Sequence, residues 1–152
     1  MIDHASIGVR DLAAAAAFYE QVLAIIGLQK LVVRETTVGF GKRYPEFWLN
    51  ARPAMSRVTD DAGSHLCLRA GTRDQVDAFH RIALAAGASD DGAPGPRPEY
   101  SDAYYAAFIR RRRRPSHRGR DLSPGGARSL ESKARCSRDT RRQNPALCSK
   151  RT

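Results

Sequence analysis

The chain repeats itself once, 61 residues further along and without a gap. The matching positions are His4 and His65, Ile7 and Leu68, Ala17-Phe18 and Ala78-Phe79, and Leu23-Ala24 and Leu84-Ala85. A period this long with only two copies indicates a duplicated module of helix and strands rather than a solenoid. The repeat therefore constrains this part of the chain to fold as two similar halves.

Both copies open with a strand and a helix. In residues 1–9, apolar side chains alternate with polar or small ones, as in a strand with one buried face. Asp11 can cap a helix that runs from Leu12 to about Ile26 and ends at Gly27. His65–Ala70 opens the second copy with a similar alternation. Each opening strand thus begins with a histidine on its less apolar face.

The second helix has a stronger start signal than the first. Thr72 and Gln75 have the spacing of a capping box, and the periodic segment that follows predicts a helix over Arg73–Ala86. Gly87 ends it. The other predicted elements are strands at Leu28–Arg34, Thr37–Lys42, Glu46–Asn50 and Tyr104–Ile109, with a Gly/Pro loop at Asp90–Pro98. These elements predict the α+β class.

Charge divides the chain near residue 110. Residues 1–109 carry 11 Lys and Arg against 13 Asp and Glu, whereas residues 110–152 carry 15 against 3. The net charge of +10 therefore comes from the C-terminal segment. We expect residues 110–152 to form a disordered basic tail. It has no aromatic residue for base stacking, so only weak, nonspecific contact with nucleic acid is expected.

Several classes of protein are not expected. No apolar run approaches the roughly 20 residues that span a bilayer, and no secretory signal is apparent. The three cysteines, Cys67, Cys136 and Cys148, show neither metal nor redox spacing. This pattern predicts a cytoplasmic protein without a disulfide framework. No nucleotide cofactor is expected.

The order of motifs resembles the glyoxalase / bleomycin-resistance / extradiol dioxygenase superfamily, also called the vicinal-oxygen-chelate family. The motifs are Ile2-Asp3-His4, Val9-Arg10-Asp11-Leu12, Phe18-Tyr19, Glu46-Phe47-Trp48-Leu49, Val76-Asp77-Ala78-Phe79-His80, Gly92-Ala93-Pro94-Gly95 with Arg97-Pro98, and Tyr104-Tyr105-Ala106-Ala107-Phe108. The resemblance covers about residues 1–109. It implies two βαβββ modules, about 1–50 and 64–109, that form an open, curled mixed sheet, often completed by dimerisation.

The resemblance also implies a site. Metal-binding members use side chains from the first strand of each module and a carboxylate from a last strand. By position these would be His4, His65 and Glu46, around a divalent ion with open positions for substrate oxygens. Trp48 and Tyr105 would line the substrate pocket. The alternative for a histidine on a strand face is a simple hydrogen-bonding role.

The family pattern stops after Phe108-Ile109. The family continues with a turn and a strand that supplies the last carboxylate, but here the chain reads Arg110 to Arg114 and then Pro115. We therefore expect the second module to lack its final strand and the metal site to lack its final ligand. Removing one nucleotide from a GC-rich codon choice for Arg110–Asp121 restores the family-like sequence. The tail is thus either a genuine extension or the product of a frameshift.

Two functions follow from the resemblance. The first is a metal-dependent lyase, isomerase or dioxygenase-like enzyme acting on a small oxygenated substrate. The second is a small-molecule binding protein of the drug-sequestering type, or an inactive truncated homologue. Fold alone does not determine chemistry. The metal content of the protein distinguishes the two functions.

Overall fold

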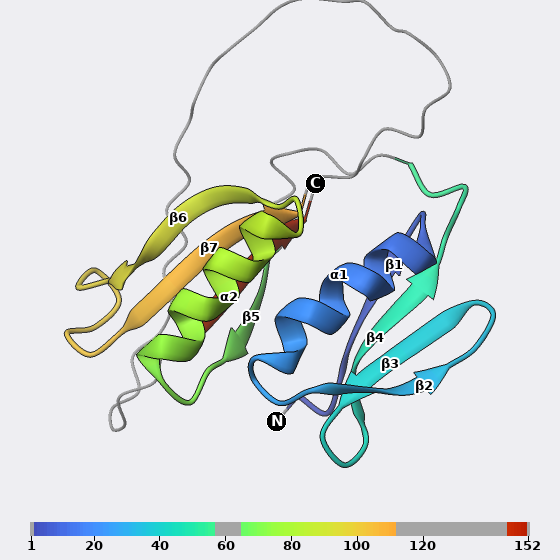
Figure 1. Cartoon of the computed structure of the whole chain (residues 1–152), viewed down its shortest axis with the longest axis horizontal. Helices are drawn as coiled ribbons and strands as arrows, with labels where there is room; N and C mark the ends of the chain where they lie inside the picture. Colours follow the sequence, from blue (N-terminus) through green and yellow to red (C-terminus); the bar gives the residue numbers. More distant parts are fainter. Residues whose placement is uncertain (1, 57–64, 112–145, 152) are drawn as a thin grey trace, which may run out of the picture.

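A computed structural model describes residues 2–56, 65–111 and 146–151. The first module consists of β1 (Ala5–Val9), α1 (Leu12–Ala24), β2 (Gln29–Val33), β3 (Thr37–Gly41) and β4 (Pro45–Ala51). The second consists of β5 (His65–Arg69), α2 (Arg73–Ala85), β6 (Ser89–Pro96), β7 (Tyr105–Arg111) and β8 (Ala146–Arg151). The α+β class predicted from the sequence is confirmed (Figure 1).

The two helices show the repeat directly. Each has 13 residues, and α2 begins 61 residues after α1. The side chain of Asp11 accepts a hydrogen bond from the backbone N–H of Ala14, and that of Thr72 accepts one from Gln75. Such caps satisfy N–H groups that have no partner within the helix. The capping signals therefore set both helix starts as the sequence predicted.

Each module forms a four-stranded sheet, and the strand order is the same in both. The orders are β1-β4-β3-β2 and β5-β8-β7-β6. The prediction that the second module lacks its final strand is wrong, because Ala146–Arg151 takes that place between β5 and β7. Its direction is reversed, however. β4 is parallel to β1 and antiparallel to β3, whereas β8 is antiparallel to β5 and parallel to β7.

A second correction concerns the Gly/Pro segment. Asp90–Pro98 was predicted as a loop, but Ser89–Pro96 forms β6. Among the strands that the structure describes, β6 pairs only with β7 and lies at the edge of its sheet, with register shifts at Gly92. Proline cannot donate to a ladder, so an edge strand with irregular register can accept Pro94 and Pro96 where a central strand could not.

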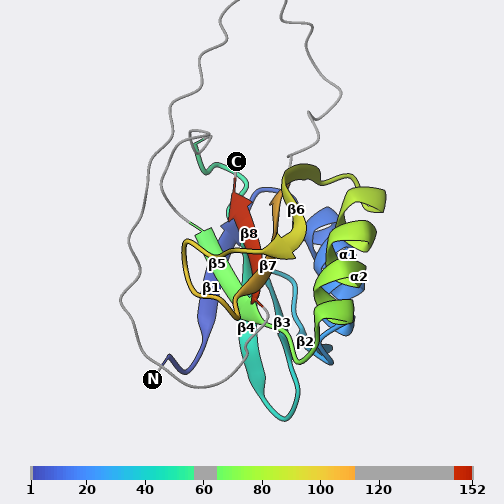
Figure 2. The same ribbon diagram turned by 90° about the vertical axis from the view of Figure 1, so that its left-hand side faces the viewer.

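Both helices cover the same side of the two sheets (Figure 2). Their buried side chains join those of the strands in one apolar cluster that includes residues of both modules. The Tyr19 ring of α1 packs 4.9 Å from the Phe47 ring of β4, and Phe79 of α2 is also buried. The opposite side of the sheets is called the open face below.

Two side chains join the modules. Gln75 of α2 accepts a hydrogen bond from the Gly71 N–H at 2.6 Å and donates one to the carbonyl of Ile25, at the end of α1, at 2.9 Å. The guanidinium of Arg111, on β7, lies 5.5 Å from the Phe18 ring of α1. The helix layer is thus held together by a polar bridge and a cation–π contact as well as by apolar packing.

Within the part of the chain that the structure describes, neither helix has the length and apolar character needed to cross a membrane.

We predict that Gln75→Ala lowers the free energy of unfolding by about 1–2 kcal/mol, because it removes the capping partner of Gly71 and the bridge to Ile25. Urea unfolding followed by circular dichroism measures the change. Gln21→Ala is the matched control, since Gln21 is exposed and bonds only to Ala17 within its own helix. Equal losses for the two variants would contradict the bridge.

Candidate functional site

The open face of the first sheet carries a mixed set of side chains. Alternation along β4 sends Phe47 and Leu49 into the core, where they are 1% and 0% exposed. Trp48 and Asn50 therefore project from the other side, and both are half-buried. Their neighbour Ser6, on β1, lies opposite Trp48 in the parallel ladder. An aromatic ring and two polar groups thus share this face.

The ring of Trp48 lies against a glycine of the adjacent strand. Gly39 of β3 is its register partner. A Cβ atom at Gly39 would lie 3.0 Å from one atom of the indole ring and 2.9 Å from the Cβ of Pro45. Both distances are below normal van der Waals contact. The glycine therefore leaves the space in which the indole lies close to the sheet.

A polar row crosses the sheet beside the indole. The Asn50 side chain donates a hydrogen bond to Ser6 Oγ, and Thr37 of β3 is the register partner of Asn50. Among the described residues, Thr37 Oγ1 is one of the buried polar atoms that have no hydrogen-bond partner. A buried hydroxyl without a partner costs free energy, and this sets Thr37 apart from the hydrogen-bonded pair of Ser6 and Asn50.

The open face of the second sheet has different chemistry. Cys67 of β5 is exposed, and its Sγ lies 3.7 Å from the hydroxyl of Tyr104. The rings of Tyr100 and Tyr104 meet edge-on at 5.3 Å. Further along the sheet, the guanidinium of Arg97 lies 5.4 Å from the ring of Phe108. This part of the face is aromatic and thiol-bearing.

The three predicted metal ligands do not form one cluster. His4 lies just before β1 and Glu46 lies in β4, at the same end of these parallel neighbours. His65 begins β5 in the other sheet. His4 Nδ1 lies 2.9 Å from Asp3 Oδ2, and the imidazole is half exposed. Residues 2–56 and 65–111, with 146–151, contain no group of three His, Cys, Asp or Glu side chains arranged to hold a metal. The donor set that the resemblance implied therefore does not fit a metal ion here.

The predicted pocket residue Tyr105 lies on the helix side of its strand. Its hydroxyl donates a hydrogen bond to Asp77 of α2 at 2.8 Å, and the guanidinium of Arg73 lies 5.2 Å from its ring. The hydrogen bond to Asp77 raises the pKa of Tyr105 above its usual value of 10.0. The neighbouring Tyr104, which contacts Cys67, has the position on the open face.

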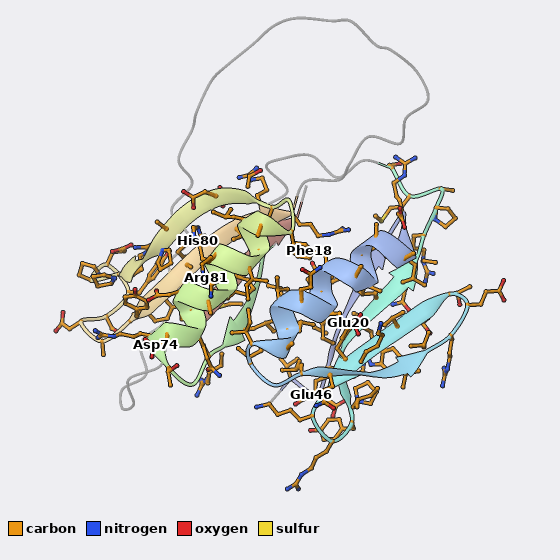
Figure 3. All side chains as sticks on the ribbon, in the orientation of Figure 1. Phe18, Glu20, Glu46, Asp74, His80 and Arg81 are labelled. Carbon is orange, nitrogen blue, oxygen red and sulfur yellow. The ribbon has the colours of Figure 1, made fainter. Side chains whose placement is uncertain are left out.

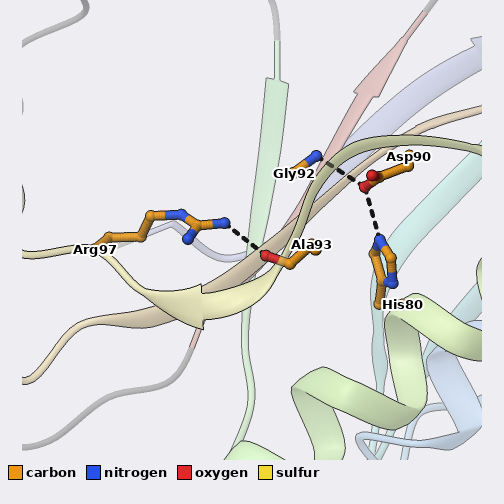
Figure 4. A network of polar contacts seen from close by, with 5 residues as sticks. All are labelled: His80, Asp90, Gly92, Ala93 and Arg97. Carbon is orange, nitrogen blue, oxygen red and sulfur yellow. Dashed lines mark hydrogen bonds and ion pairs between the residues drawn. The ribbon is translucent and has the colours of Figure 1, made fainter.

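Figure 3 shows Glu46 on the first module and His80 on the second, far apart in that view. His80 is a buried polar residue, at 9% exposure, and it lies on α2. Its Nε2 lies 2.8 Å from Asp90 Oδ1 of β6, which also accepts the Gly92 N–H at 3.0 Å (Figure 4). His80 thus forms a hydrogen bond from helix to strand, for which the sequence offers no signal.

The bond to His80, helped by that from Gly92, holds the pKa of Asp90 below its usual value of 3.8. A carboxyl whose pKa is lowered on folding stabilises the fold above its unfolded pKa and ceases to do so as pH falls through its folded pKa. We predict that Asp90→Asn is less stable than the wild type at pH 7 and that this difference shrinks as pH falls below about 4. Urea unfolding across this range measures it. In a His80→Gln background the pH dependence should be largely lost. A difference that did not vary with pH would contradict the pairing.

We predict that Gly39→Ala displaces the indole of Trp48 and lowers the free energy of unfolding by about 1–3 kcal/mol, because the added methyl has no space. Trp48 is the single tryptophan of the chain, so its fluorescence reports the displacement directly. Gly95→Ala is the control, since the nearest atom there belongs to the flexible Arg97 side chain. Unchanged emission in Gly39→Ala would show that the indole is not held against β3.

Comparison with known proteins agrees with this architecture. A glyoxalase/bleomycin resistance protein from Albidiferax ferrireducens T118 is similar over 97% of this chain and 97% of its own, with a TM-score of 0.58 and 18% identity. A glyoxalase/bleomycin resistance protein/dioxygenase family enzyme from Burkholderia phytofirmans PsJN is similar over 63% of this chain and 80% of its own, with a TM-score of 0.44 and 23% identity. No curated protein gives a significant match.

The family model described as Glyoxalase/Bleomycin resistance protein/Dioxygenase superfamily matches residues 1–110. The match ends where the sequence analysis placed the departure from the family, at about Arg110. Since it spans more than two thirds of the 152 residues, the chain belongs to the glyoxalase/bleomycin resistance protein/dioxygenase superfamily.

Proposed function

We propose that this chain binds a small molecule on the open face of its first sheet, without a resident metal ion. The observation that carries the proposal is the position of Trp48, held close to the sheet by Gly39 and adjoining the row of Ser6, Asn50 and Thr37. An aromatic surface beside a few fixed polar groups is the usual composition of a small-molecule site.

The metal-dependent lyase, isomerase or dioxygenase-like reaction suggested by the resemblance has less support. It needs His4, His65 and a carboxylate around one ion, and the described ranges of the chain contain no such three-ligand group. We therefore derive no reaction step for this chain. We therefore propose the second function considered from the sequence, ligand binding of the drug-sequestering type.

The arrangement favours a flat ligand with a hydrogen-bonding edge. The indole supplies apolar contact area at low entropic cost, because it has few rotatable bonds and already lies against β3. Ser6 is exposed to a ligand, and Asn50 already has a fixed direction because it donates to Ser6. A homodimer that completes the site stays a prediction of the resemblance.

We predict that an anionic naphthalene dye binds this face and that Trp48→Ala weakens its affinity about tenfold or more, since the lost aromatic contact is worth about 1.5–3 kcal/mol. Isothermal titration calorimetry measures the affinity without relying on the tryptophan. Val33→Ala is the matched control, because Val33 is exposed on the edge strand β2. Equal affinities for the wild type and Trp48→Ala would place the dye elsewhere.

Metal analysis tests the proposal that the site has no resident metal ion. Purified protein, His4→Ala and His65→Ala should all lack stoichiometric divalent metal. Stoichiometric metal in the wild type that is lost in both variants would contradict the proposal and restore the metal-dependent reaction.

A further inference from the structure

The open face of the first sheet extends along β1 to a glycine near the end of that strand. Val9 belongs to the apolar cluster and Ile7 packs against it, so Gly8, which lies between them, is on the open face. In the parallel ladder Gly8 is the register partner of Asn50, two residues along from the pair that contains Trp48. Two residues of a strand span about 7 Å, so Gly8 lies about that far along the sheet from the level of Trp48.

Two side chains from the segment after β4 occupy the space above Gly8. A Cβ atom there would lie 3.2 Å from Cγ of Arg52 and 3.3 Å from Sδ of Met55, both closer than ordinary van der Waals contact. Backbone hydrogen bonds place this segment: the N–H of Arg52 donates to the carbonyl of Val9 at 2.7 Å, and that of Met55 donates to the carbonyl of Arg52 at 3.0 Å. The glycine thus lets an arginine and a thioether lie on the open face beside Asn50.

The guanidinium of Arg52 bonds to a carbonyl rather than to a carboxylate. Its Nη1 donates to the carbonyl of Ala51 at 2.9 Å, which fixes the group at the end of β4. Nearby, Nε of Arg10 donates to the carbonyl of Pro53 at 3.3 Å. Among the side chains that the structure describes, no carboxylate forms an ion pair with either arginine. This end of the open face therefore carries positive charge that no described acidic side chain neutralises.

The charges along β4 give an anionic ligand one orientation. Glu46 precedes the buried Phe47, so it lies on the same face as Trp48, at the opposite end of the strand from Arg52. An anionic group on a ligand is attracted to the arginine end of the face and repelled from the glutamate end. The indole lies between the two ends.

We propose that the ligands of this site are aromatic acids, whose flat ring lies against Trp48 and whose anionic group binds the guanidinium of Arg52. This inference rests on the proposed function, because it names the ligand class of the same site. A guanidinium has five N–H donors in a planar fork, so the bond to Ala51 leaves others for the two oxygens of a carboxylate. The thioether of Met55 adds flexible apolar contact beside the ring.

The test compares 2-naphthoate with 2-naphthamide, which has a similar shape without the charge. Isothermal titration calorimetry at pH 7 and low salt should give the wild type an affinity for the acid about tenfold higher than for the amide. Arg52→Gln should reduce this preference to about twofold or less and leave the affinity for the amide unchanged. Arg43→Gln is the matched control, since it removes the same charge from an exposed residue in the turn between β3 and β4 and should keep the preference.

Trp48→Ala separates this inference from the proposed function. It should weaken the binding of both probes. If it does so while Arg52→Gln keeps the preference for the acid, the ligand class is wrong and the site stands. If Trp48→Ala changes neither affinity, the site is wrong and the inference fails with it. Equal affinities of the wild type for the two probes, or no binding of the acid, would also overturn the inference.

Gly8→Val tests the position of the guanidinium rather than its charge. The variant keeps Arg52 but adds side-chain atoms where Arg52 and Met55 lie, so the preference for the acid should fall as it does in Arg52→Gln. Circular dichroism checks that both variants are folded. A preference that survives in folded Gly8→Val would show that the acid does not bind the guanidinium in its place over Gly8.

Discussion

The backbone of β8 forms ladders with two strands at once, and the second sheet depends on this. Without Ala146–Arg151, the facing edges of β5 and β7 would each present a row of N–H and C=O groups with no partner in the sheet. β7 carries Ala107 and Ile109, which are fully buried and belong to the apolar cluster shared with the first module. The loss of β8 would thus weaken the core as well as one edge. The requirement is for backbone pairing, which any extended segment can meet, in either direction.

Because any extended segment can meet this requirement, the sequence did not predict β8, although it predicted much of the remaining fold. The repeat, the caps at Asp11 and Thr72 and the alternation in β4 are local signals, and each correctly predicted its element. Residues 146–151 follow a long basic segment and carry no strand pattern of their own. Their place in the sheet is set by pairing with the facing edges of β5 and β7. The family match ends at residue 110, so β8 lies outside it. In its sheet β8 takes the place that β4 has in the first module, with the opposite direction. The origin of this segment by a frameshift stays a prediction.

Local sequence patterns likewise predicted the positions of some candidate site residues and not of others. Trp48 was expected at the pocket, and its place follows from the parity of β4, since Phe47 and Leu49 are the apolar pair. The alternation of apolar residues gave no such guide for Tyr104 and Tyr105, because the next two residues of β7, Ala106 and Ala107, are equally apolar. The hydrogen bond to Asp77 holds Tyr105 on the helix side, whereas Tyr104 lies on the open face beside Cys67. The metal ligands were carried over by resemblance alone, and a set drawn from two sheets depends on how the modules meet, which no local pattern encodes.

The repeat also shows what the two modules do differently. Shifted by 61 residues, Ser6 falls on Cys67, so both occupy the same place on the open face of the first strand in their sheet. Each faces a residue of the strand inserted beside it. Ser6 accepts a hydrogen bond from Asn50 on β4, whereas Cys67 stands opposite Cys148 on β8. In the first module the inserted strand is fixed by a short turn, and a hydrogen bond worth about 1 kcal/mol is enough beside it. In the second module no short turn joins β8 to β7, so the place of β8 is set by its backbone ladders with β5 and β7.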